Sequence, residues 1–154
     1  MFFDEIKLGI TTTEIRKIFP TVYPVTNGSS VSDLEMFGLN GKIYAEFKFN
    51  SLKCYKFEWV EFQINEENFD QCLSIINKIC NNYSKKYGKP YSLEEGTMQF
   101  VDPKKTNHSG YIVIDSRWKT REKKFRAYFD FISDQGKYKF VFLMEFQGPD
   151  YAGF

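Results

Sequence analysis

Cysteine and histidine are the first residues of this sequence to consider for catalysis or metal binding. The chain contains three cysteines, Cys54, Cys72 and Cys80, and a single histidine, His108. A thiol beside the imidazole could act as a nucleophile, and three thiolates with one imidazole match the ligand number of Zn²⁺. The spacing favours neither use, because no Cys-x-x-Cys motif occurs and His108 lies in the turn-rich segment "DPKKTNHSG". We therefore expect a solvated His108, no catalytic residue, no metal and no cofactor.

The thiols and the first residues also bear on the compartment. Cys72 and Cys80 are eight residues apart on one expected helix, about 12 Å along its axis, which is too far for a disulfide. Three reduced thiols are typical of the cytoplasm. The start "MFFDEIKLGI" carries acids where an export signal has basic residues, and no segment has the ~20 apolar residues that span a bilayer. We expect a cytoplasmic protein with no membrane partner.

Two clusters of like charge are the remaining candidates for a functional surface. The first, here called the acidic surface, has five acids and no base, interleaved with aromatic residues: Glu58, Trp59, Glu61, Phe62, Glu66, Glu67 and Asp70. The second, here called the basic cluster, lies in "RWKTREKKFR" at an expected hairpin tip: Arg117, Trp118, Lys119, Arg121, Lys123, Lys124 and Arg126. Both patterns also fit a solvated charged face, since charge at edges and turns keeps a sheet from pairing with other chains.

The two clusters predict different partners. Acids around an aromatic anchor would steer and hold a basic protein surface. The basic cluster could contact phosphates, but the chain has 21 Lys and Arg against 20 Asp and Glu, so it lacks a wide positive footprint. A protein partner is therefore favoured over nucleic acid.

Composition predicts a domain with its own core. The 154 residues match one domain, 1–154, and 42% of them are hydrophobic. Seventeen Phe, ten Tyr and two Trp indicate a chain dominated by sheet, because aromatic side chains suit the half-buried surface of strands.

Two helices are expected. Thr11 and Glu14 have the spacing of a capping box, which predicts a short helix from Thr12 to a stop at Pro20. A long helix is expected from about Glu66 to Tyr87, with Asn65 as its cap and a stop at Gly88 and Pro90. Apolar residues recur along it at spacings of three and four: Phe69, Cys72, Leu73, Ile76, Ile79, Cys80, Tyr83 and Tyr87.

The remaining segments predict antiparallel strands. Pro24–Asp33 is expected to be a loop, with hairpin turns at Asn40-Gly41 and Asn50-Ser51. Alternation puts Ile43, Ala45, Phe47 and Phe49 on one buried face. Three further strands are expected in residues 110–120, 123–133 and 138–147. The predicted fold class is α+β, in the order α-β-β(-β)-α-β-β-β, with the helices packed on the sheet.

The first helix also carries a family resemblance. The pattern I-x-L-G-I-T-x-x-E-I-x-x-I-F, within residues 5–20, resembles the start of small two-layer domains of the β-lactamase-inhibitor-protein and outer-membrane-assembly-lipoprotein kind. The resemblance implies that Gly9 is a turn residue, that Ile15 and Ile18 lie in a core, and that the domain binds or acts as a scaffold.

These observations favour a non-enzymatic protein. We expect a bacterial immunity (antitoxin-like) protein that neutralises a toxin by occluding the toxin's active site. The toxin would have a basic domain, which the acidic surface would contact. Two alternatives stay open: an envelope-associated or scaffold domain, and a nucleic-acid binder acting through the basic cluster.

Overall fold

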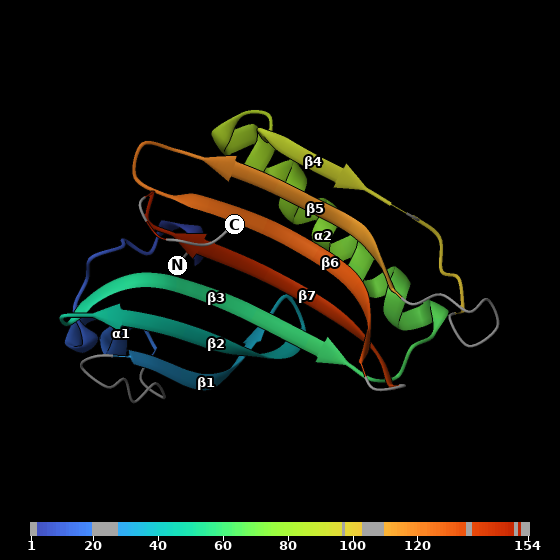
Figure 1. Cartoon of the computed structure of the whole chain (residues 1–154), viewed down its shortest axis with the longest axis horizontal. Helices are drawn as coiled ribbons and strands as arrows, with labels where there is room; N and C mark the ends of the chain where they lie inside the picture. Colours follow the sequence, from blue (N-terminus) through green and yellow to red (C-terminus); the bar gives the residue numbers. More distant parts are fainter. Residues whose placement is uncertain are drawn as a thin grey trace. The chain divides into compact units, whose positions relative to one another are not determined.

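The structure is a computed structural model that describes residues 3–19, 28–96, 98–102, 110–134, 137–149 and 151. It contains two α-helices and one seven-stranded antiparallel sheet with the strand order β1-β2-β3-β7-β6-β5-β4 (Figure 1), which confirms the α+β class. The elements are η1 (Phe3–Glu5), α1 (Thr12–Ile18), β1 (Gly28–Met36), β2 (Leu39–Lys48), β3 (Ser51–Glu61), α2 (Glu66–Tyr87), β4 (Ser92–Glu95), β5 (Gly110–Lys119), β6 (Lys124–Asp134) and β7 (Lys137–Gln147).

The chain forms two compact units that are interleaved along the sequence. Unit 1 comprises Met1–Glu58, Lys119–Phe125 and Glu145–Phe154, and unit 2 comprises Trp59–Trp118 and Arg126–Met144. Each unit is described by itself below. The expectation of a single domain stays a prediction.

Unit 1 begins with the short helix α1, which has the predicted capping box. Thr11 accepts a hydrogen bond from the Glu14 N–H at 3.2 Å, and the Glu14 carboxylate accepts one from the Thr11 N–H. Ile15 is fully buried and Ile18 half-buried, while Gly9 has φ +90°. The core continues as a cluster of rings, in which Tyr55 and Phe146 stack at 4.8 Å between centroids; the cluster comprises Phe3, Tyr55, Phe125 and Phe146.

The hairpin between β1 and β2 turns at Phe37-Gly38, where φ is +57° and +77°. The prediction of a turn at Asn40-Gly41 was wrong, because both residues lie inside β2. Gly41 is there for space: a Cβ on it would lie 2.5 Å from the Glu58 carbonyl oxygen and 2.6 Å from the Phe57 ring. The Asn-Gly pair indicates a turn in the sequence, but in the structure the glycine leaves room for an aromatic ring of the neighbouring strand.

Two further expectations in this unit need correction. Gly28–Asp33 belongs to β1, although Pro24–Asp33 was expected to be a loop; residues 24–27 lie outside the described residues. Ile43, Ala45 and Phe47 are buried as predicted, but Phe49 is 81% exposed. The β2–β3 turn lies at Phe49-Asn50, where both residues have positive φ, one residue before the predicted Asn50-Ser51. Phe49 therefore belongs to the turn and not to the buried face of the strand.

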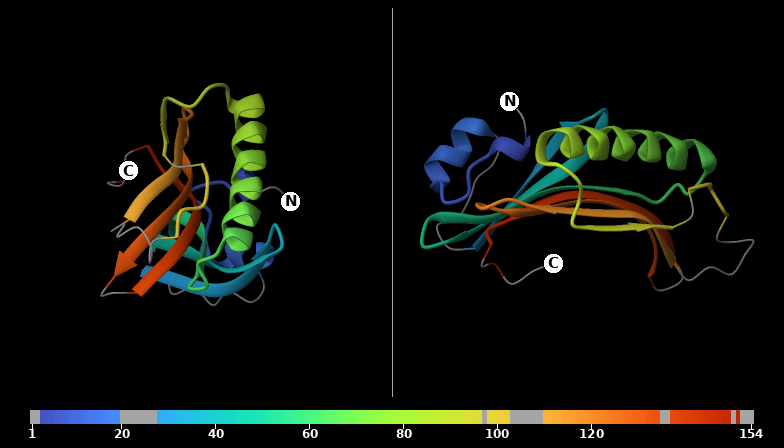
Figure 2. Two further views of the ribbon diagram at one scale, coloured as in Figure 1. Left: turned by 90° about the vertical axis from the view of Figure 1, so that its right-hand side faces the viewer. Right: turned by 90° about the horizontal axis from the view of Figure 1, so that it is seen from above.

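Unit 2 contains the long helix α2, whose predicted bounds are confirmed. Asn65 caps it by accepting from the Asn68 N–H at 2.8 Å, and Gly88 ends it with φ +86°. The helix lies along one face of the strands of its own unit (Figure 2). Phe69 contacts Phe129 and Phe140 with ring centroids 5.5 and 6.0 Å apart, and Tyr83 contacts Trp118 at 5.5 Å.

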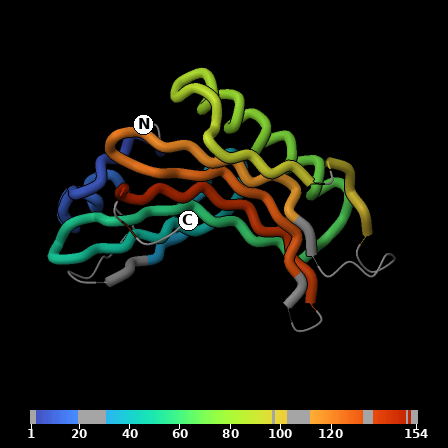
Figure 3. Tube along the Cα trace, turned by 45° about the horizontal axis from the view of Figure 1, so that its top comes forward, coloured from blue at the N-terminus to red at the C-terminus, as the bar shows by residue number. Residues whose placement is uncertain are grey.

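The strands β5, β6 and β7 follow one another antiparallel, as the path in Figure 3 shows, and they match the predicted segments. The strand β4 was not predicted. It pairs with β5 from Ser92↔Arg117 to Glu95↔Ile114, and all four of its residues are exposed. In the part of the chain that the structure describes, no helix is both long and apolar enough to cross a membrane.

Candidate functional site

The exposed part of the acidic surface lies where β3 ends and α2 begins, within unit 2. Phe62 is 65% exposed, and Glu66, Glu67 and Asp70 of the first turns of α2 are exposed as well. Glu61 is half-buried at the end of β3. The structure therefore places an aromatic ring and three exposed carboxylates on one short stretch of chain.

Hydrogen bonds hold the connection between β3 and α2 in place. The Gln63 N–H donates to the Glu61 carboxylate at 2.7 Å, and the Asn68 side-chain amide donates to the Gln63 carbonyl at 2.7 Å. Together with the Asn65 cap, these bonds fix both ends of the turn that presents Phe62. An ordered anchor of this kind loses little conformational entropy when it binds.

Two predicted members of the acidic surface have structural roles. Trp59 is buried, so the exposed aromatic residue of the cluster is Phe62. Glu58, in unit 1, is half-buried with its carboxylate 3.7 Å from the Lys56 ammonium. The sequence could not separate these roles, because they depend on which face of β3 each residue occupies.

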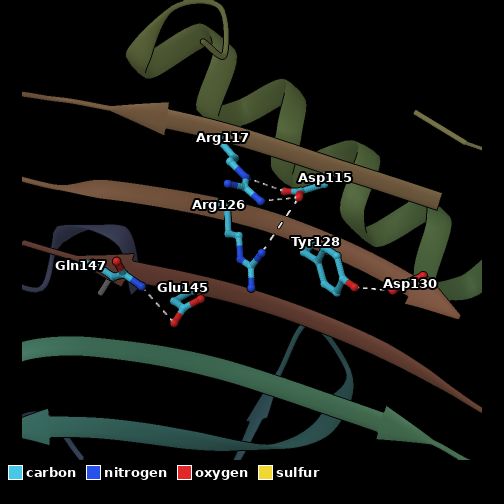
Figure 4. Close-up of polar contacts among 7 residues, drawn as sticks. All are labelled: Asp115, Arg117, Arg126, Tyr128, Asp130, Glu145 and Gln147. Atoms are coloured by element: carbon cyan, nitrogen blue, oxygen red, sulfur yellow. Dashed lines mark hydrogen bonds and ion pairs between the residues drawn. The ribbon is translucent and has the colours of Figure 1, made fainter. Parts of the chain in front are cut away.

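The part of the basic cluster in unit 2 is held by a buried carboxylate. Asp115 is 5% exposed, and its two oxygens accept from the Arg117 guanidinium at 2.9 and 3.3 Å. One guanidinium nitrogen of Arg126 lies 4.0 Å from the same carboxylate, so that Asp115 has both arginines as neighbours (Figure 4). The hydrogen bond that Arg117 donates to Asp115 raises the pKa of Arg117, and burial opposes this shift. Trp118 is buried and donates its indole N–H to the Gly88 carbonyl at 3.1 Å.

The part of the basic cluster in unit 1 includes two lysines bonded to backbone. Lys123 donates to the carbonyls of Asp4 and Ile6, and Lys124 donates to the carbonyl of Tyr151 at 3.4 Å. Lys119 and Arg121 are exposed. Most of the predicted cations of this cluster are therefore engaged within the protein.

A further polar pair in unit 2 was not singled out from the sequence. The Tyr128 hydroxyl donates to the Asp130 carboxylate, two positions along β6 (Figure 4). Burial raises the pKa of Asp130, and hydrogen bonds from Tyr128 and from the Phe131 N–H lower it in part. Burial, followed by the hydrogen bond to Asp130, also raises the pKa of Tyr128. The available signal was the alternation of polar and apolar residues along β6.

Unit 1 carries a surface groove of about 790 Å³ with side chains of both charges along it, among them Glu46, Lys48, Phe49, Lys53, Glu122 and Tyr151. A smaller hollow of about 210 Å³ shares Glu46 and Tyr151 and also contains Cys54 and Glu145. The Glu145 carboxylate lies 3.8 Å from the Cys54 sulfur and accepts from Gln147 at 3.3 Å (Figure 4). The mixed charge of the groove does not indicate one class of ligand.

The thiols are poorly suited to nucleophilic chemistry at neutral pH. Burial, followed by the nearby carboxylates of Glu145 and Glu46, raises the pKa of Cys54 to about 12. Burial raises the pKa of Cys80 to about 11 and raises that of Cys72 as well. Because the thiolate is the reactive form, the buried Cys54 and Cys72 and the half-buried Cys80 are weak nucleophiles at neutral pH.

Within the described residues, no group of three or more His, Cys, Asp and Glu side chains could hold a metal ion. His108 lies outside the described residues, and its predicted exposure stays a prediction.

No family model, curated protein or solved structure matches the chain. The resemblance of residues 5–20 to inhibitor and assembly-lipoprotein domains therefore stays a prediction.

Proposed function

We propose that this chain is a non-enzymatic protein-binding module that works in the cytoplasm as an immunity protein. Its partner is a toxin with a basic surface around the active site, and binding occludes that site. The contact surface is formed by Phe62 and the neighbouring acids Glu61, Glu66, Glu67 and Asp70.

The observation that carries the proposal is the exposure of Phe62 on a hydrogen-bonded turn among exposed carboxylates. A large aromatic side chain that is 65% exposed leaves apolar area in water, which a partner would cover. Exposed acids around such an anchor attract a basic partner and exclude an acidic one.

The arrangement of the basic cluster supports this choice of surface. Arg117 and Arg126 face the Asp115 carboxylate, and Lys123 and Lys124 donate to backbone carbonyls. A phosphate-binding surface would need these cations directed outward and available to a ligand.

Site-specific photocrosslinking in the native cell tests the surface. A photoreactive phenylalanine analogue at position 62 is expected to form a covalent adduct with one basic protein. The same analogue at position 49 is the matched control, since Phe49 is also a highly exposed phenylalanine but lies in unit 1. Equal adducts at both positions, or none at position 62, would contradict the proposal.

Growth tests the immunity function of the partner so identified. The partner expressed alone should arrest growth, coexpression with this chain should restore growth, and the Phe62→Ala variant should fail to restore it. A partner that does not impair growth would refute the immunity function and leave protein binding in place.

Charge reversal tests the electrostatic component with the purified pair. Glu67→Lys with Asp70→Lys is expected to weaken binding by roughly 10- to 100-fold, mostly through a slower association that loses its salt dependence. Glu94→Lys with Glu95→Lys changes the net charge equally on the exposed strand β4 and should leave the affinity within about threefold.

A further inference from the structure

The two edges of the sheet are built differently. The edge strand β4 has four residues and ends in two exposed acids, Glu94 and Glu95. A short, charged edge resists pairing with other chains. The other edge strand, β1, has nine residues, and in the described part of the chain it pairs with β2 alone, through an unbroken register from Gly28↔Phe47 to Met36↔Leu39. It contains no proline, lysine or bulge, the features by which proteins protect such an edge.

The charge on β1 is low as well. Its only charged residues are Asp33 and Glu35, and the Asp33 carboxylate binds the Lys42 ammonium of β2 at 2.7 Å. Val31, in the middle of the strand, is 51% exposed. The strand thus presents an apolar residue at the centre of a long, nearly neutral edge.

The turn determines which backbone groups of β1 point outward. Phe37 and Gly38 both have positive φ, which is the type I′ geometry of a two-residue hairpin, so Met36 and Leu39 form a hydrogen-bonded pair. Such pairs alternate along an antiparallel ladder. The even-numbered residues of β1 therefore bond to β2, and the odd-numbered ones, including Val31 and Asp33, direct their N–H and C=O groups to the open edge.

We propose that β1 pairs antiparallel with β1 of a second copy of this chain, about a two-fold axis at Val31. The two Val31 residues then face each other as a hydrogen-bonded pair, at the position where backbone donors and acceptors are directed outward. Their exposed side chains cover one another on the same face of the joined sheets. The dimer interface is isologous, with residues 28–34 of each copy paired.

The charges are compatible with this register. Asp33 faces position 29 of the second copy, which carries no charge, and Glu35 lies beyond the paired stretch. The two copies of Asp33 are about 13 Å apart along the strands and the two copies of Glu35 about 26 Å, at ~3.3 Å per residue. A register centred two residues further along would place two Asp33 carboxylates face to face, which is unfavourable.

This dimer goes beyond the proposed function and stands apart from it. It uses β1, and none of its residues belongs to the acidic surface, so each proposal can fail without the other.

Cysteine crosslinking tests the register. Directly opposite residues of a hydrogen-bonded pair have Cα atoms about 5.5 Å apart, which a disulfide can span. Val31→Cys is expected to form a covalent dimer under mild oxidation. Glu35→Cys is the matched control, since it is exposed, on the same strand and of the same parity, but too far from its own copy; the unmodified protein controls for Cys54, Cys72 and Cys80.

Charge pairing tests the same contact without crosslinking. Sedimentation is expected to show a reversible dimer for the unmodified chain and a dimer weakened roughly tenfold or more for Val31→Asp and for Val31→Lys, each of which places like charges opposite one another. Mixing the two variants should restore dimerisation. Both substitutions are at an exposed site, so circular dichroism should show unchanged folding.

Three results would overturn the proposal. The first is a chain that stays monomeric up to high micromolar concentration, in which case the edge would be left for an extended segment of another protein. The second is equal crosslinking at positions 31 and 35. The third is a failure of the mixed variants to associate more strongly than either alone.

Discussion

The side chain of Asn50, at the tip of the β2–β3 hairpin, caps the start of α1 through Thr12. Its Oδ1 accepts from the Thr12 backbone N–H at 3.1 Å and from the Thr12 hydroxyl at 2.8 Å. The first N–H groups of a helix have no partner within the helix, so a side chain distant in sequence supplies one here. Asn50 also has φ +57°, a conformation that asparagine tolerates better than most residues.

Replacing Asn50 should separate these two contributions. Asn50→Ala removes the acceptor and places a methyl side chain at positive φ, and we expect it to lower the free energy of unfolding by about 2 kcal/mol. Asn50→Asp keeps the acceptor and should stay within about 0.5 kcal/mol of the unmodified protein. Urea denaturation followed by circular dichroism measures both, and equal losses for the two variants would show that the hydrogen bonds contribute nothing.

Gly41 should be among the least replaceable glycines of unit 1. In Gly41→Ala the new Cβ would lie 2.5 Å from the Glu58 carbonyl oxygen and against the Phe57 ring, so the strands must separate. We expect a loss of about 2–3 kcal/mol in chemical denaturation. Gly148→Ala is the control, since a Cβ added there would have nothing within 4 Å, and it should change stability by less than about 0.5 kcal/mol.

Asp115 and Asp33 offer a comparison of a buried with an exposed ion pair. Asp115→Ala leaves Arg117 and Arg126 close together without the buried carboxylate between them, and we expect it to cost about 2–3 kcal/mol. Asp33→Ala removes an exposed pair with Lys42 and should cost less than about 1 kcal/mol. Comparable losses in urea denaturation would mean that the Asp115 carboxylate is not part of the folded state's polar network.

Cys54 should make stability depend on alkaline pH. Its pKa is raised from an ordinary 9.0 to about 12 in the folded protein, mainly by burial. The folded state thus binds the thiol proton more tightly than the unfolded state, and the resulting stability is fully present below the ordinary pKa and is lost as pH rises from 9.0 toward 12. The stability difference between the unmodified chain and Cys54→Ala should therefore decrease over that interval. Unfolding measured at a series of pH values checks this, and a pH-independent difference would contradict it.

Local signals were enough to predict α2 and the strands β5 to β7. Asn65 and Gly88 mark the ends of α2 by their own conformational preferences, and long aromatic runs identify the central strands. The errors arose where a neighbouring strand determines whether a residue is in a strand or in a turn. Gly41 is in a strand because Phe57 needs the space beside it, and Gly28–Asp33 is in a strand because it pairs with β2. Phe57 is sixteen residues from Gly41, and the residues of β2 opposite positions 28–33 are nine to nineteen residues away, so a local pattern does not show either contact.

The prediction of the candidate site was limited in the same way by contacts between strands. The composition of the acidic surface could be read from the sequence. The burial of Trp59, however, depends on the face of β3 that it occupies, and Phe62 is exposed just after that strand ends. The basic cluster looked available because its ion-pair partner, Asp115, lies two residues from Arg117 and eleven from Arg126. Only the arrangement of β5 beside β6 brings both guanidinium groups to the same carboxylate.

Trp118 of β5 makes two contacts with the carboxyl end of α2. Its indole N–H donates to the Gly88 carbonyl, and its ring packs against Tyr83. An indole in this dry environment emits light of shorter wavelength than one in water, so the junction contains its own fluorophore. With Trp59 replaced by phenylalanine, a red shift of the remaining emission would report the detachment of this helix end in real time, without any attached dye.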